Sequence, residues 1–242
     1  MATDVLTAAE FYSSRKGAVT ARLLRARLAI MWPTLAGKKL LGIGYPAPYL
    51  RQWRDEAQVC IAMTPSQIGV ASWPVGQAKL SCTAEEDALP FADRSVDRVI
   101  LVHGLEAAEQ VRPLLREIWR VLSDDGRLLV VTPNRSGMWA HLESTPFGQG
   151  QPYSAGQIAR LLHATMFREK RRDAALFIPP TDVRIILRAA PAWERSGRRL
   201  LSSFACVTIT EASKDLCAII PLQRGIRRTV LAEAVYRSIA DV

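Results

Sequence analysis

The sequence has few residues of the kinds that hold metals or form disulfide bonds. Only three histidines and four cysteines occur in 242 residues, and Cys60, Cys82, Cys206 and Cys217 show no C-x-x-C spacing. A structural zinc site needs ligands clustered at short spacing. Scattered cysteines in a chain of this size are mostly small buried apolar residues. We therefore expect neither a metal site nor a disulfide framework.

Long apolar segments and linkers are also missing. No uncharged apolar run approaches the roughly 20 residues that a membrane-spanning helix needs. The N-terminus has no basic segment leading into an apolar one, so no secretory signal is predicted and a cytoplasmic location is favoured. Hydrophobic residues make up 49% and charged residues 23%, the balance of a globular protein. With no linker rich in Gly, Ser or Pro, we expect a single domain over residues 1–242.

Negative charge is scarce in the last third of the chain. Residues 1–159 hold 17 Lys/Arg against 15 Asp/Glu, whereas residues 160–242 hold 15 against 8. A basic C-terminal third of this kind is typical of a surface that meets nucleic acid, anionic lipid or an acidic partner. However, no nucleic-acid motif accompanies the charge, and arginine outnumbers lysine 26 to 6. A solvated basic surface is therefore an equal alternative.

Short apolar runs alternate with helical patterns along the chain. Helical spacing covers the first thirty residues, ending at Trp32-Pro33, and residues 111–122, with a glycine cap at Gly126. Further on, a capped helix is predicted for 154–165 and a basic helix for 181–201. The predicted strands are 38–44, 59–63, 78–82, 99–102, 128–131, 174–178 and 204–210. This alternation predicts an α/β, doubly wound, mostly parallel sheet with helices on both faces.

The first predicted strand ends in two glycines that bear on ligand binding. In open parallel sheets, ligands bind at the carboxyl ends of strands where the strand order reverses. Gly42 and Gly44 stand at such an end, and without side chains they would let a nucleoside cofactor approach the backbone. Two glycines in a tight strand-to-helix turn have the same appearance, so this signal alone is weak.

Several motifs together resemble the central block of class I S-adenosylmethionine-dependent methyltransferases of the type 11 kind. The matching stretches are residues 85–91, 95–99, 102–106 and 115–127. The resemblance covers about residues 38–131. The loop that follows Pro133 is similar to one in a bacterial subgroup associated with genes neighbouring glyoxalase II. The family resemblance implies a seven-stranded Rossmann-like fold and transfer of a methyl group from S-adenosylmethionine to an acceptor that it does not name. Residues 1–33 would then be an N-terminal helical segment, 38–131 the cofactor-binding half and 132–242 the substrate side.

The resemblance also assigns cofactor-binding positions. Gly42 and Gly44 match the family's glycine loop, Thr64 the ribose-binding carboxylate, and Glu85 the acid that hydrogen-bonds the adenine amine. Two positions depart from the pattern. The family usually has an acidic residue where this sequence has Leu40, and a third glycine where it has Pro46. The alternative is therefore a non-catalytic scaffold that has lost the cofactor site and docks a protein or nucleic acid through its basic third. If the cofactor binds, Gly44→Asp should abolish binding without unfolding the domain.

The remaining candidate residues follow the fourth and fifth predicted strands. His103 follows the strand at 99–102, where a histidine near neutrality is a suitable base, although a structural role is the favoured alternative. Asn134, Arg135, Trp139 and Tyr153 lie on a long loop at the carboxyl edge of the sheet, and such loops often bind substrate. The equal alternative is a loop packed over the sheet edge by its own aromatic side chains.

Overall fold

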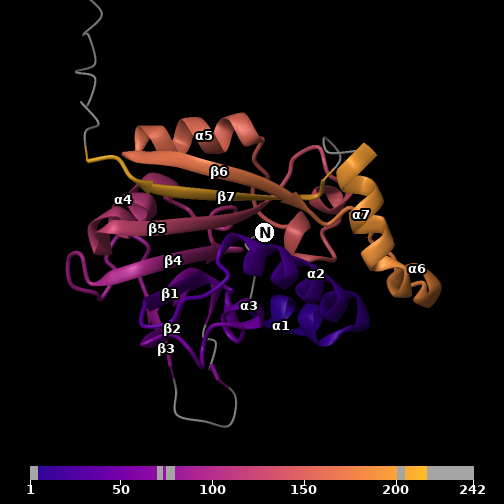
Figure 1. The fold of residues 1–242 in the computed structure, drawn as a ribbon, viewed down its shortest axis with the longest axis horizontal. Coiled ribbons are helices and arrows are strands. Elements are labelled where there is room, and N and C mark those ends of the chain that lie inside the picture. The colour runs from indigo at the N-terminus through magenta and orange to yellow at the C-terminus, as the bar shows by residue number, and fades with distance from the viewer. Residues whose placement is uncertain (1–4, 70–72, 75–79, 201–204, 217–242) are drawn as a thin grey trace, which may run out of the picture.

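The computed structural model describes residues 5–69, 73–74, 80–200 and 205–216, and it contains one seven-stranded sheet (Figure 1). Its strand order is β3-β2-β1-β4-β5-β7-β6. Strands β1 to β5 pair in parallel, and β7 runs antiparallel between β5 and β6. The predicted α/β, mostly parallel, doubly wound sheet is thereby confirmed. The strands are β1 (Lys39–Gly44), β2 (Val59–Pro65), β3 (Ser81–Ala84), β4 (Val96–Val102), β5 (Leu122–Pro133), β6 (Phe167–Ala175) and β7 (Val207–Lys214).

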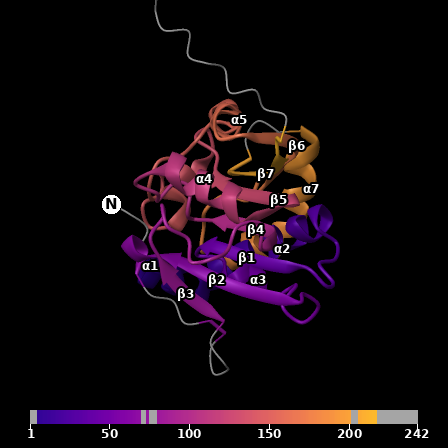
Figure 2. The same ribbon diagram turned by 90° about the vertical axis from the view of Figure 1, so that its left-hand side faces the viewer.

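Helices cover both faces of this sheet, and Figure 2 shows α2 and α4 on opposite sides of it. The α-helices are α1 (Val5–Ser13), α2 (Arg15–Met31), α3 (Ala47–Leu50), α4 (Val111–Val121), α5 (Ala155–Ala164), α6 (Arg184–Arg188) and α7 (Ala190–Leu200). Three short 3-10 helices are η1 (Ser66–Ile68), η2 (Met138–His141) and η3 (Pro146–Gly148).

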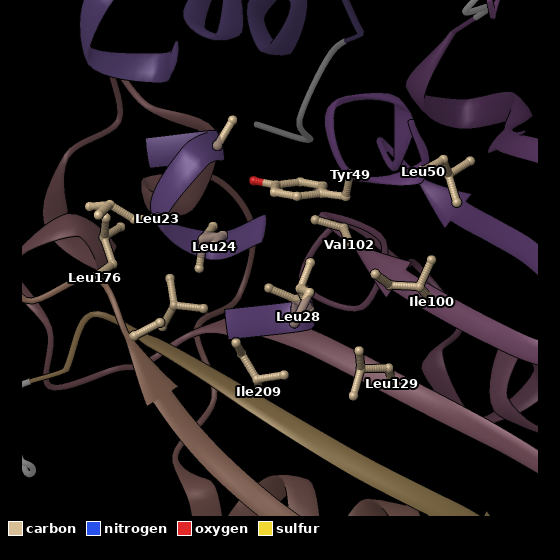
Figure 3. Packing of buried hydrophobic residues seen from close by; sticks show 14 of the residues in the cluster. Leu23, Leu24, Leu28, Tyr49, Leu50, Ile100, Val102, Leu129, Leu176 and Ile209 are labelled. Carbon is tan, nitrogen blue, oxygen red and sulfur yellow. The ribbon is translucent and has the colours of Figure 1, made fainter. Parts of the chain in front are cut away.

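The central strands β4 and β5 each carry an unbroken apolar run where both of their faces are buried. Along β4, Val99 and Leu101 pack with the helices α4 and α5, whereas Ile100 and Val102 face the opposite way. Figure 3 shows this second face. There the side chains of α2 and α3 meet those of β4, β5 and β7, among them Leu24, Leu28, Tyr49, Leu50, Ile100, Val102, Leu129 and Ile209.

Two expectations about helix ends are wrong. The predicted N-terminal helix is interrupted at Ser14, whose Oγ accepts a hydrogen bond from Gly17 N at 3.0 Å and so begins α2 as a new helix. Gly126 is not a helix cap, because α4 is followed at once by β5, which contains this glycine. In contrast, the predicted cap of α5 is confirmed, since Ser154 and Gln157 form a reciprocal capping box.

The C-terminal elements differ more from the prediction. The strand expected at 174–178 is β6 at 167–175, an edge strand that is rich in charge and exposed at its middle. The basic helix expected at 181–201 is two helices that break at Ala189. The last strand begins at Val207, and part of the predicted ranges 78–82 and 204–210 lies outside the described residues.

The described residues contain neither a candidate membrane-spanning helix nor a candidate metal-binding cluster. None of the described helices is long and apolar enough to cross a bilayer. Within the same residues, no group of three or more His, Cys, Asp or Glu side chains is arranged to hold a metal ion. Cys60, Cys82 and Cys206 are in no disulfide bond among the described residues, and Cys217 lies outside the described part of the chain.

One arginine of α4 holds the turn before β4. The guanidinium of Arg120 donates hydrogen bonds to the backbone oxygens of Leu89 and Phe91, both at 2.9 Å. It also donates to the carboxylates of Glu117 at 2.7 Å and Asp93 at 2.6 Å. The turn at residues 89–93 is therefore fixed to the helix by Arg120 together with Glu117, whose Oε2 accepts a hydrogen bond from Leu89 N at 2.9 Å.

Arg120→Met should lower the free energy of unfolding by about 1–2 kcal/mol, because the carbonyls and carboxylates of this turn lose their donor. Urea unfolding of the wild type and the variant measures the difference. Arg116→Met is the matched control, since Arg116 is exposed on the same helix. Equal losses in the two variants would contradict a specific role of Arg120.

Candidate functional site

Four predicted site residues lie in a row at one edge of the sheet. Because β3, β2, β1 and β4 are neighbours and run in parallel, their carboxyl ends meet at the same edge. Glu85 follows β3, Thr64 lies near the end of β2, Gly44 ends β1 and His103 follows β4. The structure therefore brings these residues to neighbouring positions, in the order of the strands.

Gly44 of this row and Gly42, two residues before it, serve close packing within the chain. Gly44 has a φ of +91°, and a Cβ there would lie 2.2 Å from the backbone oxygen of Val102. The next residue, Tyr45, donates its N–H to that same oxygen at 2.8 Å. At Gly42, a Cβ would lie 2.6 Å from the Cβ of Pro46. The expectation that Gly44→Asp spares the fold is therefore wrong, because any side chain there collides with backbone.

The positions at the ends of β2 and β3 carry polar groups. Thr64 is buried, and its Oγ1 has no hydrogen-bond partner among the described residues. Glu85 is exposed and accepts hydrogen bonds from Ser66 Oγ at 2.7 Å and Gln67 Nε2 at 3.1 Å. A cavity of about 250 Å³ adjoins Glu85, and its lining also includes Glu86. This end of the row is open and acidic.

The end of the row at β4 is instead closed by a buried chain of hydrogen bonds. The hydroxyls of Tyr49 and Tyr12 are 2.6 Å apart, and the Tyr12 hydroxyl is 2.7 Å from His103 Nε2. On the other side of the imidazole, His103 Nδ1 is 3.1 Å from Glu106 Oε1. His103 and Glu106 are only 1% and 3% exposed. Residues from three distant parts of the sequence thus form one buried network.

The protons in this network can be assigned from its donors and acceptors. Burial raises the pKa of both Tyr12 and Tyr49, so each phenol keeps its proton. Where His103 Nδ1–H donates to the Glu106 carboxylate, Nε2 is left to accept from the Tyr12 hydroxyl, and Tyr12 in turn accepts from Tyr49. Glu106 Oε2 has no hydrogen-bond partner within the described residues. The imidazole is therefore held by a carboxylate with its free nitrogen on a hydroxyl, which is the geometry of a general base.

Aromatic rings cover this network. Tyr45 stacks on Tyr12 with ring centroids 5.7 Å apart, and Phe147 of η3 meets the edge of His103 at 4.7 Å. Tyr12 and Glu106 are parts of the site that the sequence analysis missed. Glu106 could have been found from its place three residues after His103. Tyr12 gives no such signal, because it lies 91 residues from its partner.

The four candidates on the long loop do not stay together. Trp139 is buried, donates its Nε1–H to Ile178 O at 2.8 Å and packs against Phe147. Asn134, Arg135 and Tyr153 meet at the end of β5, where Arg135 N donates to Tyr153 O at 3.2 Å. Trp139 thus takes the place of a packing residue, while the other three remain beside the sheet edge.

Part of the chain matches a known protein family, and part of it is similar to known proteins. Residues 41–130 match the family described as "Methyltransferase domain". An uncharacterized protein of Mycobacterium tuberculosis and another of Mycobacterium bovis are each 30% identical over 143 residues, or 56% of this chain. The chain spans about half the length of these curated relatives, with 50% of each covered.

Solved structures share the fold at low sequence identity. A chain from the Haloferax volcanii complex with the Trm112 methyltransferase activator has a TM-score of 0.60 at 18% identity, covering 88% of this chain and 99% of that one. A SAM-dependent methyltransferase from Thermotoga maritima has a TM-score of 0.53 at 16% identity, covering 81% of this chain and 92% of that one. The [4+2]-cyclase SpnF has a TM-score of 0.54 at 22% identity, covering 80% of this chain and 81% of that one.

The sheet order, the row of residues at its edge and these likenesses define the class I methyltransferase fold. Residues 41–130, which hold most of β1, all of β2 to β4 and part of β5, match the methyltransferase-domain family that the sequence resembles.

Proposed function

We propose that this chain is an S-adenosylmethionine-dependent methyltransferase that holds its methyl acceptor beside His103. The methyltransferase domain at residues 41–130 supports the class of reaction. The observation that carries the proposal is the buried pair of His103 and Glu106 at the end of β4, with Nε2 of the histidine 2.7 Å from a hydroxyl. The strand order reverses between β1 and β4, which is where ligands of such sheets bind.

The residues at the ends of β2 and β3 fit the nucleoside part of this cofactor. Thr64 Oγ1 is a buried polar atom with no hydrogen-bond partner in the described chain, and Glu85 offers a carboxylate on the next strand. Beside β1, Tyr12 lies among Tyr45, Tyr49 and His103. We therefore propose that Thr64 and Glu85 hold the nucleoside and that α1 moves aside when the cofactor binds.

The roles of the residues follow from their contacts. Bound S-adenosylmethionine supplies a methyl group already activated by a positively charged sulfur. His103 Nε2, which accepts a hydrogen bond from the Tyr12 hydroxyl in this structure, takes the proton of the methyl acceptor. Glu106 holds the imidazole in place and stabilises its protonated form. The rings of Phe147 and Tyr45 keep water away, and the rest of the catalysis is alignment.

Calorimetric titration with S-adenosylmethionine and S-adenosylhomocysteine tests this proposal. We expect micromolar binding to the wild type, about −8 kcal/mol. Glu85→Gln should weaken binding about tenfold, because an amide replaces a charged acceptor. Asp125→Asn is the control, since Asp125 is exposed near the amino end of β5, away from the cavity beside Glu85, and this variant should bind as the wild type does. Absence of heat with both ligands, together with absence of a thermal shift, would contradict the proposal.

A second candidate function is favoured by the departures at β1. Leu40 is buried among apolar side chains, and Pro46 begins the turn into α3. With the cover of aromatic rings, these residues suit a non-catalytic protein of the same fold that docks a partner. The structural neighbour from Haloferax volcanii comes from a complex with an activator protein, which supports a protein partner for either candidate. Failure of the titration above would favour this second function.

A further inference from the structure

A separate cavity lies between α2 and α7, which stand side by side at one end of the molecule (Figure 1). Its volume is about 750 Å³, and four arginines line it: Arg27 on α2, and Arg195, Arg198 and Arg199 on α7. Apolar side chains, including Leu23 and Ile30, complete the wall. None of these residues belongs to the site at the ends of β1 to β4.

Two of these arginines carry buried donors that the described residues do not satisfy. The Nε atoms of Arg27 and Arg198 are buried, and neither has a hydrogen-bond partner among the described residues. Other parts of the same side chains are engaged, since Arg27 Nη2 pairs with Asp173 and Arg198 Nη2 is 3.9 Å from Glu194 Oε2. Buried donors are normally satisfied, so these two atoms indicate an acceptor that the described residues do not supply.

One carboxylate, that of Glu194, also lies in the wall of the cavity. Its Oε1 accepts a hydrogen bond from Phe177 N at 2.8 Å, while Oε2 has no hydrogen bond within the described chain. Burial raises the pKa of Glu194 and so disfavours its negative charge. The guanidinium groups therefore dominate the charge of the cavity.

Arg198 also lines a second cavity, of about 600 Å³, which reaches Asn134 at the end of β5. Arg172 and Ser154 are among the other residues of its lining. Because the two cavities share Arg198, this residue lies where they meet. Of the four guanidinium groups, that of Arg198 is therefore the best placed to bind an anionic group from either cavity.

We propose that the cleft between α2 and α7 binds a small anionic amphiphile, a molecule with one phosphate or carboxylate group on an apolar body. The planar guanidinium fork matches the oxygens of both anions. The apolar wall formed by Leu23 and Ile30 matches the body. The cavity volume lies in the usual range for small-molecule sites, about 300–1,000 Å³. This binding does not depend on methyl transfer.

Titration of the full chain with octyl phosphate and octanoate, below the concentrations at which they form micelles, tests the proposal. We expect saturable one-to-one binding of at least one of them, and binding of octyl glucoside at least tenfold weaker. The tighter of the two anions identifies the anionic group as a phosphate or a carboxylate. Equal binding of the neutral octyl glucoside, or no binding of either anion, would overturn the proposal.

Variants locate the binding. The double variant Arg195→Ser, Arg199→Ser changes two exposed side chains and should weaken binding at least tenfold. Ala26→Trp leaves the charge unchanged but fills the cleft, so it should weaken binding to a similar degree. Arg160→Ser on α5 is the control and should have no effect, because Arg160 is exposed outside the cleft. Unchanged binding in the first two variants would place the ligand elsewhere and refute the proposal.

Discussion

Replacing His103 with leucine is expected to lower the free energy of unfolding by about 3 kcal/mol at neutral pH. The variant removes the only hydrogen-bond donor that the described residues offer to the Glu106 side chain, whose other oxygen already has no partner. It also removes the acceptor of the Tyr12 hydroxyl. A carboxylate left unpaired in the interior is among the costly changes that one substitution can make. Denaturant unfolding followed by fluorescence or circular dichroism measures the loss.

Two further variants separate this effect from a simple change in packing. His163→Leu, on the exposed side of α5, should stay within about 0.5 kcal/mol of the wild type. The double variant His103→Leu, Glu106→Leu should regain most of the lost stability, because no buried charge remains. A loss below about 1 kcal/mol in the single variant would mean that the hydrogen bonds of His103 do not hold Glu106.

The central strands could be predicted from the sequence because each contains consecutive apolar residues that mark its buried part. A strand covered on both faces is a short unbroken apolar run, as at Val99 to Val102. The edge strand β6 has no such run, since one of its sides meets solvent and it carries charge at successive positions. Its position depends on pairing with β7, about forty residues further on, which no local pattern records.

The site was predictable only where it follows from strand ends. Gly44, Thr64, Glu85 and His103 each stand next to a predicted strand, so their common edge follows from a parallel sheet. The closure of that edge by Tyr12 could not be predicted, because it joins an N-terminal helix to β4 across the fold. A pattern of residues fixes where a site can lie, but long-range packing decides what fills it.

Trp139 illustrates the same limit. An aromatic residue on a long loop is equally suited to binding a substrate and to anchoring the loop. The distinction depends on its indole N–H, which donates to Ile178 O, 39 residues away. The structure therefore favours the packing alternative for this residue. Asn134, Arg135 and Tyr153 remain proposed substrate contacts, since they lie at the end of β5 beside the sheet edge.

Tyr12→Phe should increase the affinity for S-adenosylmethionine about tenfold, if α1 must move aside for the cofactor as proposed. The phenol hydroxyl makes two hydrogen bonds that hold the closed arrangement, one with Tyr49 and one with His103. Losing both should destabilise that arrangement by about 1.4 kcal/mol, while the ring can still stack on Tyr45. The open state that can bind the cofactor then makes up a larger fraction of the protein, and the apparent dissociation constant falls in proportion. Calorimetry on the wild type and the variant measures the change.

The control for this prediction is Tyr45→Phe, which removes the hydroxyl of the stacked ring and leaves the chain from Tyr49 to His103 intact. Its affinity for the cofactor should equal that of the wild type. Weaker binding by Tyr12→Phe alone would mean that the Tyr12 hydroxyl contacts the cofactor, so that α1 is part of the binding site and does not obstruct it. Because the two models predict opposite signs, this single hydroxyl decides whether α1 opposes or completes the cofactor site.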